Sequence, residues 1–148
     1  MRPAKTSLAL LILALMTACS NFILKPVDYS WPIESVLKVD ARGNAEEQRY
    51  SLILKVKPLY FLEFSDSTIF SGKEIRIIRD KAGYLYITGK EFKNVYVFLP
   101  VENGLRLENK IAISEKNMSS PAFNQKLPYI ELLDEGNKYL LNNKGLVR

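Results

Sequence analysis

Apolar residues recur at nearly every second position along most of the chain from Ile33 onward. A period of two places successive side chains on opposite faces and is typical of half-buried strands. Clusters of Gly, Asn, Asp and Pro interrupt this alternation at short intervals, as expected for turns. The pattern predicts eight or nine strands, at 33–40, 50–56, 59–64, 74–79, 84–88, 94–99, 105–113, 129–133 and 138–141.

The clearest hairpin joins the two alternating segments 74–79 and 84–88 across the turn residues 80–83. A second hairpin is expected at the C-terminus, around the turn 134–137. Short turns connect antiparallel neighbours, and no segment shows a convincing helical period. The sequence therefore predicts a single small all-β domain, either an antiparallel β-sandwich or a closed barrel. Spacing alone leaves that choice open.

One segment also permits a helix. Asn44 could cap a helix, and Glu46 and Glu47 would suit its first turn. The residues that follow, 50–56, alternate between apolar and polar, and Pro58 ends the alternation. We therefore favour a strand there.

The first nineteen residues have a different pattern. Arg2 and Lys5 precede the uninterrupted apolar run Leu8–Met16, and the small residues Thr17–Ala18 come directly before Cys19. This order of basic, apolar and small residues is typical of an export signal. With the cysteine in place, it resembles the lipobox of bacterial lipoproteins. The resemblance implies that residues 1–18 are a cleaved signal peptide and that Cys19 carries the lipid.

An uncleaved membrane anchor is the alternative, because the uncharged stretch Thr6–Leu24 has nearly the length that spans a bilayer. Its second half is interrupted by polar residues, and the continuous apolar run is only nine residues long. That length suits a signal peptide better than a membrane span.

The resemblance divides the chain into a signal peptide, a tether over 19–32 and a β-rich domain over 33–148. It also implies that the protein is located in the cell envelope and is anchored to a membrane through Cys19. Ser20 in place of Asp matches delivery to the periplasmic face of the outer membrane in lipoproteins of the enteric type. Removing the signal peptide leaves 19 basic against 16 acidic residues, a net charge of +3. That small excess gives no indication of nucleic-acid binding.

The chain offers few groups for catalysis. It contains no His, and it has neither a glycine-rich phosphate loop nor a nucleophile elbow. Four carboxylates, Glu63, Asp66, Glu74 and Asp80, lie near one another in sequence, but solvated strand faces explain them better than a glycosidase pair. The acidic turn 134–137 lacks the ligand series of a calcium loop. We therefore expect no enzyme, no metal site and no cofactor.

The expected function is a non-enzymatic binding or scaffolding β-domain that contacts an unidentified envelope protein or polymer. The alternative is a lipocalin-like carrier, in which a barrel encloses an apolar ligand. The longest stretch with neither the strand period nor the helix period is 115–128. It is the candidate contact loop, with Phe123, Asn124 and Gln125 as the contact residues. Phe123 could instead fold back over the core as a plug.

Overall fold

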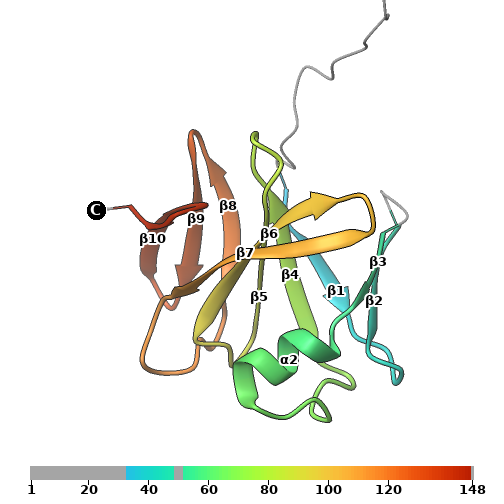
Figure 1. Ribbon diagram of the computed structural model, residues 1–148. Coiled ribbons are helices and arrows are strands. Elements are labelled where there is room, and N and C mark those ends of the chain that lie inside the picture. Colours follow the sequence, from blue (N-terminus) through green and yellow to red (C-terminus); the bar gives the residue numbers. More distant parts are fainter. Residues whose placement is uncertain (1–32, 49–51, 148) are drawn as a thin grey trace, which may run out of the picture.

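The computed structural model describes residues 33–48 and 52–147 of the chain (Figure 1). These residues form antiparallel β-structure with one short α-helix, which confirms the all-β prediction for this part of the chain. The predicted signal peptide, Cys19 and the tether lie outside the described residues.

The described strands form three separate antiparallel sheets, of five, four and two strands. The five-stranded sheet has the order β1 (Ser35–Lys38), β4 (Glu74–Arg79), β5 (Leu85–Gly89), β6 (Asn94–Val101) and β7 (Gly104–Ala112). The four-stranded sheet has the order β11 (Gly145–Leu146), β10 (Asn137–Asn142), β9 (Tyr129–Asp134) and β8 (Ala122–Lys126). The hairpin of β2 (Asn44–Glu47) and β3 (Leu52–Lys55) is the third sheet.

The closed barrel predicted as one of the two architectures is wrong for this part of the chain. The four-stranded sheet touches both edges of the five-stranded sheet, but without a continuous ladder. At the β1 edge, Ile33 and Asn124 form an isolated bridge. At the β7 edge, the Asn109 side-chain amide donates a hydrogen bond of 3.3 Å to the Asn143 carbonyl. A barrel needs strand pairing all the way around, and here neither seam has a continuous ladder of strand pairs.

The strand predicted over residues 59–64 is also wrong, because these residues belong to the helix α2 (Lys57–Phe64). Pro58 was interpreted as the end of a strand, but it is the second residue of the helix, where the N–H that proline lacks has no intrahelical acceptor. The helix ends at Phe64. The next residue, Ser65, donates its N–H to the Phe61 carbonyl and turns the chain out of the helix with a left-handed φ of 57°.

The described residues contain eleven strands, and three of them, β2, β8 and β11, were not predicted. β2 pairs with β3 from Asn44↔Lys55 to Glu47↔Leu52, so the helix considered for this segment is wrong. The strand preferred for 50–56 is confirmed over Leu52–Lys55. β8 lies within the stretch 115–128, which was predicted to be irregular throughout.

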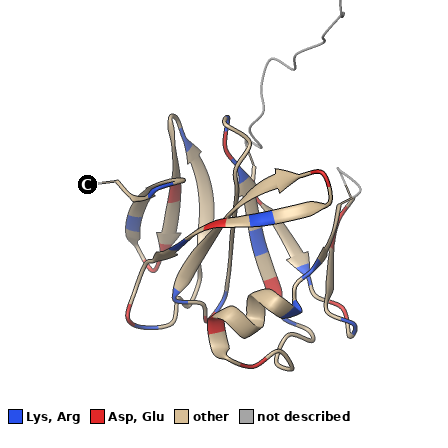
Figure 2. Ribbon diagram, viewed as in Figure 1, with Lys and Arg blue, Asp and Glu red and all other residues tan. Residues whose placement is uncertain are grey.

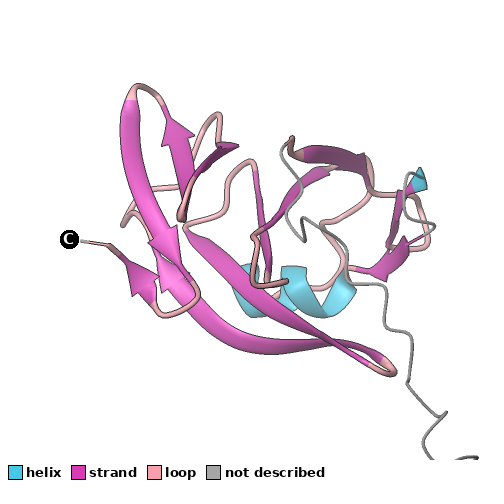
Figure 3. Ribbon diagram, turned by 90° about the horizontal axis from the view of Figure 1, so that it is seen from above, coloured by secondary structure: helices cyan, strands magenta, loops and turns pink. Residues whose placement is uncertain are grey.

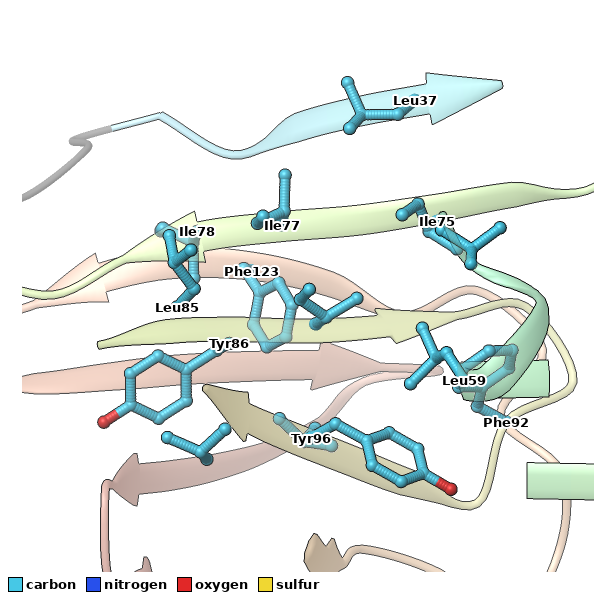
Figure 4. Close-up of a cluster of buried hydrophobic side chains, with 14 of the residues drawn as sticks. Leu37, Leu59, Ile75, Ile77, Ile78, Leu85, Tyr86, Phe92, Tyr96 and Phe123 are labelled. Carbon is cyan, nitrogen blue, oxygen red and sulfur yellow. The ribbon is translucent and has the colours of Figure 1, made fainter. Parts of the chain in front are cut away.

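The core lies between the two larger sheets and α2, and Figure 4 shows aliphatic and aromatic side chains from both sheets meeting there. Rings fix α2 in place. Tyr60 packs edge-on against Phe92 with centroids 5.5 Å apart, and Phe64 packs edge-on against the same ring at 5.4 Å. Such pairs add to the hydrophobic stabilisation of a buried helix.

Candidate functional site

Of the four carboxylates that lie close together in sequence, Glu63, Asp66 and Asp80 have separate structural partners, and Glu74 is exposed on β4. Glu63 accepts hydrogen bonds from the Lys93 N–H at 2.5 Å, the Asn94 amide at 2.8 Å and the Tyr96 hydroxyl at 2.7 Å. It therefore ties the end of α2 to β6. Asp66 accepts from the N–H and hydroxyl of Thr68, in the exposed loop after the helix.

Asp80 closes the β4–β5 hairpin. One of its oxygens accepts the Tyr84 N–H at 2.9 Å, and the other accepts the Tyr86 hydroxyl at 3.0 Å. No group of three potential metal ligands occurs among the residues that the structure describes.

The acidic turn 134–137 is a two-residue hairpin loop between β9 and β10. Glu135 and Gly136 have φ values of 47° and 85°, as a tight hairpin turn requires. Its carboxylates hold the chain before β8, since Asp134 accepts the Ser120 N–H at 2.8 Å and Glu135 accepts the Ser119 hydroxyl. The turn therefore has a structural role.

The three candidate contact residues lie on β8. The ring of Phe123 is only 6% exposed and belongs to the core, where Figure 4 shows it among side chains of the five-stranded sheet. Gln125 is half-buried, whereas Asn124 is exposed. The amide of Asn124 lies 3.5 Å from the Glu131 carboxylate on the neighbouring strand. Of the three, Asn124 has the side chain best placed to reach a partner, and the contact itself stays a prediction.

Sequence reasoning missed a groove of about 720 Å³ between β3, α2 and the tip of the β6–β7 hairpin. In Figure 3 the helix lies between the long hairpin and the smaller strands of the β2–β3 sheet. The groove is lined mainly by apolar side chains from these segments and from β5. The lining residues are Leu52, Ile53, Leu54, Lys55, Val56, Pro58, Leu59, Leu62, Ile87, Phe98, Pro100, Val101, Glu102, Asn103, Gly104 and Leu105.

An overhang of the β6–β7 hairpin creates one wall of the groove. β6 pairs with β5 only through Tyr96, Val97 and Phe98, whereas it pairs with β7 as far as the turn. An irregular register between Val97 and Phe98 marks the point beyond which the hairpin leaves the sheet. Its tip therefore stands free on the side of the β2–β3 hairpin.

The floor comes from α2. Leu59 is buried under the groove, and Leu62 is 46% exposed at its surface. Figure 2 shows the charged positions of this helix near its two ends, Lys57 at the start and Glu63 beside the last residue, with uncharged residues between. The helix thus presents an apolar surface to the groove.

The chemistry of the groove suits binding. Ile53 on β3 is 63% exposed and Val101 on the hairpin is 42% exposed, so both walls contribute exposed apolar residues to the lining. The charged lining residues are Lys55 and Glu102, one on each wall. The lining offers apolar surface with a few polar groups, which is the usual composition of a ligand or peptide site.

The sequence signal for this groove is weak, because its walls come from segments about fifty residues apart. The stretch 59–64 was predicted to be a strand, so its apolar residues were assigned to a sheet. Within the described ranges no helix has the length and apolar character needed to cross a membrane. Comparisons of the chain with protein-family models, with curated proteins and with solved structures find no match.

Proposed function

We propose that the protein is a lipid-anchored envelope lipoprotein whose β-domain binds an apolar part of another envelope component in the groove between β3, α2 and the β6–β7 hairpin. The observation that carries this proposal is the convergence of exposed apolar side chains on one concave surface. Single exposed apolar residues are ordinary on protein surfaces, but a contiguous concave set marks a binding site.

The proposed anchor is Cys19, whose position after Thr17–Ala18 resembles a lipobox. The tether 19–32 joins the domain at Ile33. In Figure 1 this end of the described chain lies at the opposite end of the molecule from α2. A domain held by that end would keep the helical side of the groove away from the membrane surface. This arrangement suits a partner that approaches from the periplasmic space.

We also propose that the domain that carries the groove is the predicted antiparallel β-sandwich. It is supported by the packing of β4 against β8 and by a core to which both larger sheets contribute. A rigid scaffold of this kind suits binding, because it holds the loop tips and edges of the groove at fixed positions.

A carrier of a small apolar ligand is the second candidate. The volume of the groove supports it, because pockets for small molecules usually measure roughly 300–1,000 Å³. A carrier would use the same groove, so the two candidates differ in the occupant. Ligand extracted from protein purified out of native envelopes, and identified by mass spectrometry, would favour the carrier. A protein crosslinked to residues of the groove would favour the scaffold.

The groove is tested with the apolar fluorophore N-phenyl-1-naphthylamine and the mature protein. Leu62→Glu places a charge on the groove floor and is expected to weaken binding of the fluorophore at least tenfold. Phe61→Glu is the matched control, because Phe61 is the preceding residue of α2, is 58% exposed and does not line the groove. Equal loss in both variants, or loss in neither, would contradict the proposed site.

The anchor is tested separately. Cells expressing the protein are grown with labelled palmitate, and the label is expected on the wild type and not on Cys19→Ser. Incorporation of label into Cys19→Ser would exclude the lipobox interpretation. Lipidation with more than one chain would give stable anchoring, because each buried CH₂ contributes about 0.8 kcal/mol.

A further inference from the structure

We infer, on the basis of the proposed function, that the partner enters the groove as an extended peptide segment that pairs with the free edge of β3. The partner class would then be a protein with an accessible extended segment of alternating apolar residues. Recognition by strand addition combines backbone hydrogen bonds with apolar contacts.

The groove runs along one edge of β3. Five successive residues, from Leu52 to Val56, line it. Side chains of a strand alternate between its two faces, so a surface that touches every residue in turn follows the strand's edge. Among the described residues, β3 pairs with β2 alone, which leaves that edge without a neighbouring strand.

The hydrogen bonds between β3 and β2 determine which backbone groups of β3 point to its free edge. The Val56 N–H donates a 2.9 Å hydrogen bond to the Gly43 carbonyl, which makes this pair the hydrogen-bonded kind. Hydrogen-bonded pairs alternate along an antiparallel ladder, so Leu54 also turns its N–H and C=O toward β2. The N–H and C=O groups of Ile53 and Lys55 therefore point to the free edge, into the groove.

The opposite wall lacks one of the backbone donors that a strand edge would offer. It is the tip of the β6–β7 hairpin, where Pro100 has no N–H to donate. A segment lying in the groove would pair with β3, place alternate side chains on the floor formed by Leu59 and Leu62, and turn the others to solvent.

The same geometry disfavours the other occupants. An acyl chain would cover the edge groups of Ile53 and Lys55 without bonding them, which is unfavourable. The edge of a second folded copy would have to fit between β3 and the hairpin tip, which form the two walls of the groove above α2. A single extended segment needs only the width of one strand.

The inference is tested by titrating the mature protein with a blocked hexapeptide of alternating valine and serine. Two modified versions of this peptide carry N-methyl groups on alternate amides. One is methylated at the odd positions and the other at the even positions. N-methylation removes donors from one edge of a strand only. Strand addition predicts that the affinities of these two N-methylated peptides differ at least tenfold, because only one of them loses the donors that bond β3.

A variant of the protein supplies the second measurement. Ile53→Pro removes one edge N–H, and proline is tolerated at edge positions where the N–H faces away from the ladder. It is expected to bind the unmodified peptide at least tenfold more weakly than Ile53→Val does. Ile53→Val keeps the N–H and serves as the control.

Equal affinities of the two N-methylated peptides would overturn strand addition. If fluorophore binding still depended on Leu62 in that case, the proposed groove function would stand. A dimer of the protein that excludes the peptide would assign the edge to a second copy and would likewise overturn the inference.

Discussion

The Phe123 N–H donates a 2.8 Å hydrogen bond to the carboxylate of Glu34, a residue 89 positions earlier in the chain. The other oxygen of this carboxylate pairs with the Arg76 guanidinium on β4. Glu34 thus joins the start of β1 to both larger sheets through one partly buried group.

Glu34→Ala should lower the free energy of unfolding by about 2 kcal/mol, because it removes two charge-assisted hydrogen bonds and leaves Arg76 without this partner. Urea unfolding measures the change. The matched control is Glu74→Ala on the same sheet, where the side chain is exposed and the expected change is within about 0.5 kcal/mol. Equal effects of the two substitutions would show that Glu34 has no special role.

Phe123→Ala should cost about 3 kcal/mol or more, because the ring is buried in the core and its removal leaves a cavity. Thermal unfolding measures the loss. Asn124→Ala, at the neighbouring exposed position, should leave stability nearly unchanged. Recovery of crosslinked envelope partners with Asn124→Ala then tests the predicted contact: unchanged recovery would contradict a contribution from this residue.

Glu63→Ala should loosen α2, because it removes three hydrogen bonds between the helix and the segment Lys93–Tyr96. We expect faster hydrogen exchange in the helix and weaker fluorophore binding, since α2 forms the groove floor. The expected loss of stability is about 2 kcal/mol. Asp66→Ala is the control, since within the described part of the chain that carboxylate bonds Thr68 alone, in the exposed loop. Unchanged exchange in Glu63→Ala would contradict the anchoring role.

Stability should fall steeply in alkali because of buried tyrosines. Burial, with a smaller contribution from the Glu91 charge, raises the pKa of Tyr60 to about 12. Burial is also the main cause that raises the pKa of Tyr86 and of Tyr96. Unfolded tyrosines lose their protons near pH 10, whereas these three keep theirs when folded. The unfolded state then binds fewer protons, so stability declines above pH 10, by up to about 1.4 kcal/mol per pH unit for each tyrosine.

Urea unfolding at pH 8 and pH 11 measures this decline, and phenolate absorbance follows the titration. Tyr60→Phe should flatten the decline. It should also leave stability at pH 7 unchanged or slightly raised, because the Tyr60 hydroxyl is buried with no hydrogen-bond partner among the described residues. A stability profile that is flat from pH 8 to pH 11 would contradict the prediction.

The strands with clear alternation, such as β4, β5 and β7, could be predicted because local pattern and tertiary burial agree there. The helix α2 could not. Its residues LYFLEF follow neither a period of two nor a clean helical period, and its stability comes from Glu63 and from rings that contact Phe92. Those contacts come from β6 and the turn before it, about thirty residues later.

β2 and β8 were missed for a related reason. β2 has the sequence NAEE, which is suited to the start of a helix, and only its pairing with β3 makes it a strand. β8 has a single large apolar residue, Phe123, among polar neighbours. The groove depends on the placement of α2, so a sequence pattern that misses the helix also misses the site.

The position of β1 determines the order in which the chain can fold. Its ladder partner is β4, with Ser35 opposite Ile77, and Ile33 just before β1 bridges Asn124 of β8, which comes later still in the chain. The meanders β4–β7 and β8–β11 can form from neighbouring strands as the chain is made. β1 can therefore pair with β4 once about half of the chain has been made, whereas the bridge between Ile33 and Asn124 requires nearly all of it. Closing such long loops is slow, and a ribosome-bound chain shorter than β8 cannot complete this fold.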